Sequence, residues 1–386
     1  MTMPSLLVLD QWAGPDVSAG TSKNWLYKGL AQVFEAKVLN ADTGFPQQYE
    51  RFASLAAAVA THPGDFRKEY HRRLEWASKR PRAFTARTRR FQREMDAQNH
   101  FFDVVLQVGC LFGPVVLPGA LHASYHDQTV AMVEKGWSPW LPPDFGSFRE
   151  QWIELEMRSL QSKDIILTYS DRTKRSMIED YGVAVEKVFV APTACKIDYP
   201  SREAVLRQRQ NKLLFASTDF FRKGGDILLD AFQILRKHMP ALELVLVGGA
   251  VPCALPEGAS HLGKVTHSEL VDLCLESALI LHPARHDAFP NVLKEAQACG
   301  LPAVASASAG IPEIVRHERT GLILDRPDGG TLAEAVLALL HDAPRLESMR
   351  LACLEDRERY KPEVCVGRIA ALLTRALEQT NAGTGR

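Results

Sequence analysis

Short and almost entirely apolar runs, each about the length of one β-strand, recur along the chain and alternate with longer segments of helical pattern. The runs are Leu6–Leu9, Val104–Val108, Ile165–Tyr169, Val188–Ala191, Leu213–Ala216, Leu242–Val247, Leu279–His282 and Ala303–Ala305. A strand that is apolar at successive positions is typical of a sheet buried on both faces. Such strands, alternating with helices, form parallel sheets covered by helices. The sequence therefore predicts an α/β fold.

The chain is long enough for two sheets of this kind. Its 386 residues exceed the size at which a single hydrophobic core usually divides into two. The polar stretch Cys195–Lys212, rich in Arg and Gln, separates two series of apolar runs. We therefore expect an N-terminal domain at residues 1–195 and a C-terminal domain at residues 196–362.

The composition excludes several classes of protein. With 46 basic and 46 acidic side chains the net charge is zero, so no overall field attracts the chain to nucleic acid. The seven cysteines form no Cys-x-x-Cys pair, which favours free thiols in a reducing cytosol over a metal site. The apolar run at the N-terminus is too short for a secretory signal or a membrane span. We expect a soluble cytosolic protein.

The segment His286–Val315 places two acids around a turn from strand to helix. Asp287 precedes the turn, and Glu295 lies within a helix predicted at Asn291–Cys299. Pro290 suits the first position of that helix. The free amides at the helix start carry about half a positive charge, which is a natural seat for a diphosphate. The alternative for an isolated acid pair is that Glu295 lies on a solvated face and Asp287 caps the helix.

The same segment resembles the signature of retaining GT4 glycosyltransferases with the GT-B fold, in which two acids, usually glutamates, flank seven residues. The first acid is Asp287 here. The similarity continues through Glu295-Ala296, Gly300-Leu301-Pro302, Gly310-Ile311-Pro312-Glu313 and Gly321-Leu322. The resemblance implies two doubly wound Rossmann-like domains facing a central cleft. It also implies a C-terminal helix, at about residues 363–380, that crosses back onto the first domain.

The resemblance assigns roles to the residues of this segment. In the family the second acid binds the ribose hydroxyls of the nucleotide, and this position is Glu295. The first acid and the turn amides address the sugar and the diphosphate, which implies a catalytic Asp287. The corresponding donor-binding turn consists of Phe289, Pro290, Asn291 and Val292.

A cationic loop before paired glycines marks a second part of the donor site. Arg222 and Lys223 precede Gly224-Gly225, so a compact positive charge stands where backbone can approach a phosphate closely. Lys223 matches the family lysine that grips the leaving diphosphate, and we include it in the catalytic set. The usual arginine position falls near Thr218, which leaves Arg222 as the candidate for that role. The alternative is that both cations begin a solvated helix.

Two segments of the first domain resemble elements that contact the sugar and the acceptor. His126 and Asp127 are similar to the His-Asp element of the family, which implies that His126 positions the donor sugar and that Asp127 supports it or contacts the acceptor. In the loop after the first strand, Gly14 and Gly20 are candidates for acceptor contacts, although the family's adjacent glycine pair is missing. A structural histidine and plain turn glycines are the alternatives.

The segment Arg67–Arg93 is rich in arginine and lysine, with Trp76 and Phe84 between the cations. Such a run is usually a solvated helix face. Because it lies in the half of the chain expected to receive the acceptor, we also consider peripheral contact with an anionic membrane at its inner face.

The resemblance implies transfer of a hexosyl unit from a nucleotide diphosphate sugar to a hydroxyl acceptor in glycan, polysaccharide or glycolipid synthesis, without a cofactor. No Asp-x-Asp motif is present, so no metal is expected; Glu154 and Glu156 only look similar, in a helical context. The alternatives are a sugar phosphorylase, a nucleotide-sugar epimerase and a noncatalytic nucleotide-sugar-binding subunit. A nicotinamide enzyme is less compatible, because no Gly-x-Gly-x-x-Gly motif follows a strand.

Overall fold

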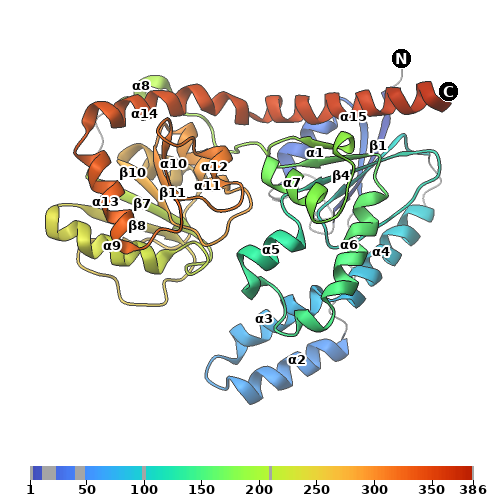
Figure 1. Ribbon diagram of the computed structural model, residues 1–386, viewed down its shortest axis with the longest axis horizontal. Helices are drawn as coiled ribbons and strands as arrows, with labels where there is room; N and C mark the ends of the chain where they lie inside the picture. Colours follow the sequence, from blue (N-terminus) through green and yellow to red (C-terminus); the bar gives the residue numbers. More distant parts are fainter. Residues whose placement is uncertain (1–2, 11–22, 40–47, 98–100, 208–210, 385–386) are drawn as a thin grey trace. The chain divides into compact units, whose positions relative to one another are not determined.

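The computed structural model describes residues 3–10, 23–39, 48–97, 101–207 and 211–384. The chain forms two compact units (Figure 1). The first comprises Met1–Ala191 together with Val366–Arg386, and the second comprises Pro192–Cys365. The division between Ala191 and Pro192 lies just before the boundary that the sequence places after residue 195.

The first unit is built on a six-stranded parallel sheet with the strand order β2-β1-β3-β4-β5-β6. The strands are β1 (Ser5–Asp10), β2 (Glu35–Leu39), β3 (Val104–Val108), β4 (Leu121–His126), β5 (Ile165–Thr168) and β6 (Val188–Val190). In the parallel register, Val8 of β1 lies opposite Val38 on one side and Leu106 on the other. All carboxyl ends of these strands therefore lie along one edge of the sheet, which is where open α/β sheets bind ligands.

Helices cover both faces of this sheet. The helices of this unit are α1 (Asn24–Leu30), α2 (Gln48–Thr61), α3 (Phe66–Ser78), α4 (Pro81–Asp96), α5 (Val130–Gly136), α6 (Arg149–Gln161), α7 (Asp171–Glu179) and α15 (Pro362–Thr384), with short 3₁₀ turns at Ser138–Trp140, Phe145–Ser147 and Val185–Lys187.

Alternation along β1 assigns each helix layer to a face. Leu6 and Val8 belong to a core that includes residues of α1 and of α15, such as Leu30 and Ile369. Leu7 and Leu9 belong to the opposite core, which includes Phe91 of α4. These side chains are almost fully buried, and full burial of each one stabilises the fold by about 1.5–3 kcal/mol.

The second unit repeats the same plan with the strand order β12-β11-β10-β7-β8-β9, again parallel. The strands are β7 (Lys212–Ser217), β8 (Glu243–Gly248), β9 (Ala259–His261), β10 (Leu279–His282), β11 (Ala303–Ser306) and β12 (Gly321–Leu324). The helices are α8 (Arg202–Val205), α9 (Gly225–His238), α10 (His267–Glu276), α11 (Asn291–Ala298), α12 (Ile311–Ile314), α13 (Gly329–Leu340) and α14 (Ala343–Asp356), with a 3₁₀ turn at Arg357–Tyr360. Residues of α9 and α13, among them Phe232 and Val336, pack with Phe215 of β7 in the main core.

The long α15 links the two units along the sequence, because it begins in the second and its residues from Val366 onward belong to the first. Ile369, Ala370 and Leu373 are buried in the core of the first unit. Within the described residues, no helix is both long and apolar enough to span a bilayer. All seven cysteines lie within the described residues, and none of them forms a disulfide.

Candidate active site

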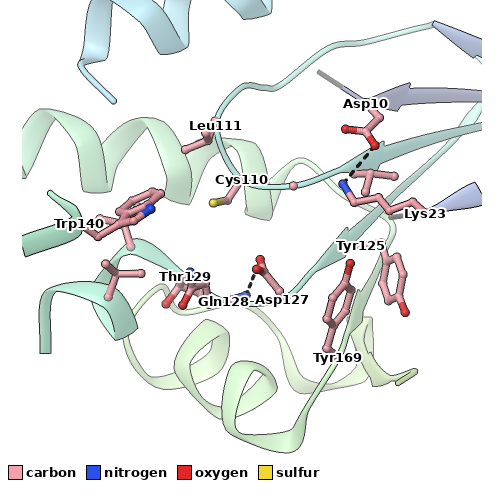
Figure 2. A pocket seen from close by; sticks show the side chains of 14 residues that line it. Asp10, Lys23, Cys110, Leu111, Tyr125, Asp127, Gln128, Thr129, Trp140 and Tyr169 are labelled. Atoms are coloured by element: carbon pink, nitrogen blue, oxygen red, sulfur yellow. Dashed lines mark hydrogen bonds and ion pairs between the residues drawn. The ribbon is translucent and has the colours of Figure 1, made fainter. Parts of the chain in front are cut away.

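A cavity of about 370 Å³ opens at the carboxyl ends of β1, β3, β4 and β5 in the first unit (Figure 2). Asp10 ends β1, Gly109 follows β3, and Asp127 and Tyr169 follow β4 and β5. Asp127 is one of the predicted acceptor-contact residues, and its carboxyl group lies in the cavity wall. The predicted Gly14 and Gly20 lie outside the described residues.

His126 occupies the last position of β4, next to Asp127, and is not one of the residues that line this cavity. Its ring is 1% exposed, and neither nitrogen has a hydrogen-bond partner among the described residues. Burial lowers the pKa of His126 to about 3, with Lys163 and Lys23 acting in the same direction. The imidazole is therefore neutral at pH 7, and its contact with a donor sugar stays a prediction.

A second cavity, of about 520 Å³, lies in the second unit at the ends of β7 and β8 and at the start of α11. It brings together most of the residues predicted for the donor site, which are Lys223, Asp287, Phe289, Pro290, Asn291, Val292 and Glu295. Lys223 and the segment Asp287–Glu295, from two separate parts of the sequence, thus share one cavity. Gly248, with φ +113, permits this close approach, because an added Cβ would lie 2.1 Å from the Ser217 carbonyl oxygen.

The turn before α11 differs slightly from its predicted form. Pro290 is the N-cap, with φ −65 and ψ 121, and the helix begins at Asn291. We predicted Pro290 at the first helical position. Its extended ψ instead makes it the residue that precedes the helix. The amides at the start of α11 still border the cavity through Asn291 and Val292, and they have no intrahelical acceptor.

Lys294 anchors α11 to the segment that precedes the first strand of the second unit. Its side chain is fully buried, and its Nζ donates to the carbonyl oxygens of Thr193 (3.1 Å) and Ala194 (3.2 Å) as well as to the Thr193 hydroxyl. Burial lowers the pKa of Lys294 to about 8. This contact ties the first residues of the second unit to the helix that carries Glu295.

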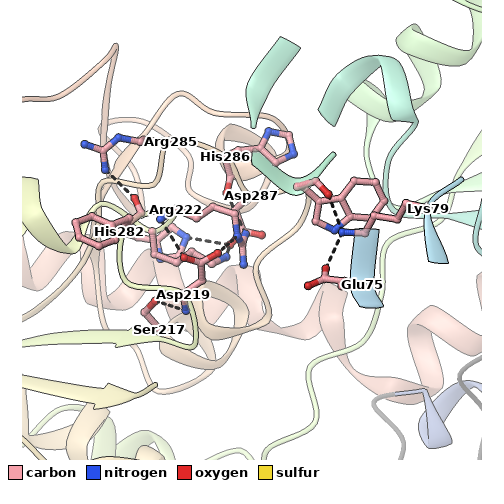
Figure 3. A network of polar contacts seen from close by, with 12 residues as sticks. Glu75, Lys79, Ser217, Asp219, Arg222, His282, Arg285, His286 and Asp287 are labelled. Carbon is pink, nitrogen blue, oxygen red and sulfur yellow. Dashed lines mark hydrogen bonds and ion pairs between the residues drawn. The ribbon is translucent and has the colours of Figure 1, made fainter. Parts of the chain in front are cut away.

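Lys223, Asp287 and His282 form a buried network beside this turn (Figure 3). The Lys223 ammonium contacts the Asp287 carboxylate, and His282 Nε2 lies 3.1 Å from Asp287 Oδ2. Burial, with the nearby Lys223 and Arg222, holds the pKa of His282 well below its ordinary value. The neutral ring can therefore donate from Nε2 to Asp287. The sequence analysis did not identify His282, because a histidine at the end of an apolar strand carries no distinct signal.

The environment of Lys223 has two opposing effects on its charge. Burial lowers the pKa of Lys223 well below its usual value, and Arg222 acts in the same direction. Contact with the Asp287 carboxylate favours the charged ammonium. Lys223 thus lies in the cavity wall already paired with Asp287, so a bound diphosphate would have to share the lysine with this acid.

Arg222 braces the loop and is not one of the residues that line the cavity. Its Nε donates to Asp219 Oδ2 (3.1 Å), and its Nη1 donates to the His286 carbonyl oxygen (3.1 Å). It therefore connects the loop that carries Lys223 to the loop that carries Asp287. Its direct contact with a diphosphate stays a prediction.

Glu295 points into the cavity from α11 and is 7% exposed. No group among the described residues is hydrogen-bonded to its carboxylate, and burial raises the pKa of Glu295. Lys264 lies in the same cavity wall and was missed by the sequence analysis. The signal available for it was weak: Lys264 follows Gly263 and precedes a Thr266/Glu269 capping box, a pattern that marks a helix start rather than a ligand site.

The basic segment Arg67–Arg93 is less uniformly exposed than its composition suggests. Arg87 is buried and donates to the carbonyl oxygens of Leu111 and Ser78 (both 2.8 Å). Lys79 is also buried, with Glu75 and the Trp140 carbonyl as acceptors (Figure 3). Phe84 lies in a hydrophobic core. Helix α4 therefore uses the face that carries Phe84 and Arg87 for packing.

Comparisons with known proteins agree with this arrangement. Residues 200–352 match the family profile described as "Glycosyl transferases group 1". A D-inositol 3-phosphate glycosyltransferase from Catenulispora acidiphila is 29% identical over 64% of this chain and 65% of its own length. A GDP-mannose-dependent alpha-(1-6)-phosphatidylinositol monomannoside mannosyltransferase from Mycobacterium tuberculosis is 27% identical over 69% of this chain and 72% of its own.

Among solved structures, a sucrose-phosphate synthase from Thermosynechococcus elongatus superimposes with a TM-score of 0.69 at 15% sequence identity, covering 97% of this chain and 100% of that one. At this identity the likeness concerns the fold alone. Residues 200–352 therefore match the glycosyl transferases group 1 family, within a chain that has the GT-B fold.

Proposed function

We propose that the chain is a retaining glycosyltransferase of the GT4 family that moves a hexosyl unit from a nucleotide diphosphate sugar to a hydroxyl acceptor. The observation that carries the proposal is the cavity of the second unit, where Lys223, the first amides of α11, Asp287 and Glu295 share one wall. Cations and amides suit a diphosphate, and an open carboxylate suits ribose hydroxyls. The two relatives named above, both glycosyltransferases, support the same class of reaction.

The proposed mechanism is mainly electrostatic. As the bond from the sugar to the diphosphate breaks, negative charge grows on the leaving phosphate. Lys223 and the amides near Asn291 stabilise this charge as it develops, and Lys264 adds a further cation at the cavity wall. The leaving phosphate oxygen then accepts the proton of the acceptor hydroxyl, which attacks from the same face of the sugar. Asp287, held by His282, orients the sugar hydroxyls.

A direct test begins with binding. Calorimetry with the nucleoside diphosphates of uridine, guanosine and adenosine should identify the base, and the matching nucleotide sugars should then be assayed for transfer. Proton NMR of the product reports the anomeric configuration. Retention supports the proposal. Inversion contradicts the retaining mechanism, and binding without turnover for every donor and acceptor offered favours the noncatalytic alternative.

We also propose peripheral contact with an anionic membrane, at a cytoplasmic location, and we place it on the α2–α3 hairpin. Helix α2 packs against α3 and exposes apolar side chains at helical spacing, namely Phe52 (64%), Leu55 (39%) and Val59 (48%). Arg67 and Lys68, at the start of α3, are exposed. An apolar stripe beside basic side chains is the pattern of a helix that lies in a lipid interface. A membrane-bound acceptor, as in a glycolipid, would account for this surface.

A further inference from the structure

The side chains that line the cavity of the first unit limit the chemical class of ligand that it can bind. Its walls are mostly apolar and aromatic, formed by Leu111, Val130, Val133, Tyr125, Trp140 and Tyr169. Tyr125 and Tyr169 lie with ring centroids 4.5 Å apart, and the Tyr125 hydroxyl donates to the Ala191 carbonyl oxygen (2.9 Å). Lys79 lies 3.7 Å from the Trp140 ring centroid. The aromatic rings are therefore held in place and offer apolar surface to one ring of a ligand.

The charged groups that face this cavity are predominantly acidic. Lys23 is already engaged, because its Nζ lies 3.1 Å from Asp10 Oδ2, which also accepts from the Tyr27 hydroxyl. Asp127 accepts a hydrogen bond from the Gln128 amide (2.9 Å) and forms no ion pair among the described residues. Burial raises the pKa of Asp127, against the influence of Lys23.

Helix α5 begins at the cavity wall, where its free amides would normally attract a phosphate. Here the first three amides have acceptors of their own. Val130 N donates to Glu156 Oε1 (3.2 Å), Ala131 N to the Tyr181 hydroxyl (3.1 Å) and Met132 N to Thr129 Oγ1 (3.2 Å). The helix start thus offers no free donor to an anion, and one of its acceptors is itself an acid.

We infer that this cavity binds an uncharged hydroxylated ring of the acceptor, and that Asp127 together with the capped start of α5 excludes a phosphorylated ring. The inference rests on the proposed function and gives its acceptor a chemical class. A sugar hydroxyl can donate to Asp127 while its apolar face packs on the aromatic rings. A phosphate in the same place would meet a carboxylate, and the one cation among the described lining residues, Lys23, is paired with Asp10. The acceptor would thus differ from the inositol phosphate after which the Catenulispora acidiphila relative is named.

The test uses the full chain, saturated with the nucleoside diphosphate that it binds, and matched pairs of probes. Saturation-transfer NMR should compare D-mannose with mannose 6-phosphate and myo-inositol with D-inositol 3-phosphate. We expect each neutral ring to bind at least about tenfold more tightly at low salt, with the difference shrinking as salt screens the repulsion. Asp127→Asn should reduce the discrimination, and Trp140→Leu should weaken binding of every probe. Asp171→Asn, which changes an exposed acid on α7, is the matched control. It should change neither the discrimination between neutral and phosphorylated rings nor the affinity for any probe.

Equal or tighter binding of the phosphorylated rings would overturn the inference, as would the absence of binding by all four probes. Neutral-ring binding that is indifferent to both Asp127→Asn and Trp140→Leu would do the same. If circular dichroism shows that Asp127→Asn does not fold, Trp140→Leu still tests whether the probes bind in this cavity. Nucleoside diphosphate affinity, measured on the same samples, reports on the second unit alone. Loss of that affinity would refute the proposed function rather than the acceptor class.

Discussion

Asp287 stands at the first acidic position of the signature that the sequence resembles, where a glutamate is usual. Its carboxylate is held between the Lys223 ammonium and His282 Nε2. A diphosphate that enters the cavity must share Lys223 with Asp287. The ion pair thus joins the two residues to which the proposal gives separate roles, Lys223 on the leaving diphosphate and Asp287 on the donor sugar.

Replacing Lys223 by alanine should weaken nucleoside diphosphate binding by roughly 10- to 100-fold. The reason is the loss of a charge-assisted contact worth about 1.5–3 kcal/mol, after which Asp287 faces the phosphate unshielded. Titration calorimetry measures the effect. Lys237→Ala, at an exposed position near the end of α9, is the control and should bind like the parent. Parent-like affinity in the Lys223 variant, for every nucleoside diphosphate that the parent binds, would remove this lysine from the site.

At the scale of residues, the sequence predicted the members of the donor cavity that lie within short motifs. Phe289, Pro290, Asn291, Val292 and Glu295 follow one another along one turn and one helix, so local spacing brings them to one wall. Lys264 and His282 come from separate elements that only the sheet topology brings near. No local pattern marks them. Arg222 is the opposite case: its motif predicted a residue of the donor cavity, but in the structure its side chain connects two loops and does not line the cavity. Its bonds go to Asp219 and to the His286 carbonyl.

At the scale of elements, apolar runs predicted the strands that are covered on both faces and missed most of those at sheet edges. The prediction for β3 and β10 matches the structure in full, because nearly every residue of these strands is buried. The edge strands β2 and β9 have exposed positions and no continuous apolar run. Strand β4 is central and buried but contains Ser124 and two histidines, so hydropathy alone did not identify it.

The start of α9 depends on Gly224, which holds the loop of Lys223 in place. Gly224 has φ +76, and an added Cβ would lie 2.0 Å from the Pro283 carbonyl oxygen. Gly224→Ala should therefore lower the free energy of unfolding by at least about 1–2 kcal/mol, from the left-handed conformation alone, and weaken nucleotide binding. Gly330→Ala, at the start of α13 with 3.5 Å to its nearest neighbour, should stay within about 0.5 kcal/mol. Urea denaturation of both variants tests this, and equal stability would show that the loop tolerates the side chain.

Glu156 of α6 gives the packing of α5 and α6 a pH dependence. Burial raises the pKa of Glu156 from 4.5 to about 8, while its hydrogen bonds to Tyr181 and Val130 oppose the shift. The folded state thus retains a proton that the unfolded state loses, and the stabilisation from this proton is full below pH 4.5 and is lost as pH rises through about 8. Glutamine mimics the protonated form.

Glu156→Gln should accordingly melt within about a degree of the parent near pH 4.5 and several degrees higher at pH 8.5. Thermal melts followed by circular dichroism measure the difference. Glu154→Gln changes an exposed acid on the same helix. Its melting temperature should differ from that of the parent by the same amount at pH 4.5 and at pH 8.5. A Glu156→Gln effect of the same size at both pH values would show that burial does not hold the proton.

At the scale of the whole molecule, the zero net charge means that any attraction to a membrane must be local. Sedimentation of the chain with vesicles should rise with the fraction of anionic lipid and fall as salt screens the charges over about 8–10 Å. The double variant Phe52→Ser, Val59→Ser should reduce sedimentation several-fold, because it removes the apolar stripe of α2. Val185→Ser, at another exposed apolar position, should not. Equal sedimentation on neutral and anionic vesicles would contradict the membrane proposal.

The central claim is that the second unit binds a nucleotide diphosphate sugar with Glu295 on the ribose and Asp287 on the sugar. The measurement that tests it most directly compares nucleoside diphosphate affinity and turnover in Glu295→Ala and Asp287→Ala, both checked for folding by circular dichroism. Glu295→Ala should weaken nucleotide binding by roughly 10- to 100-fold, from the loss of hydrogen bonds to a charged group worth about 1.5–3 kcal/mol. Asp287→Ala should preserve nucleotide affinity and reduce turnover, because its partner sugar is held most strongly at the transition state. A folded Glu295→Ala variant that binds nucleotide as well as the parent would contradict the ribose assignment and the account built on it.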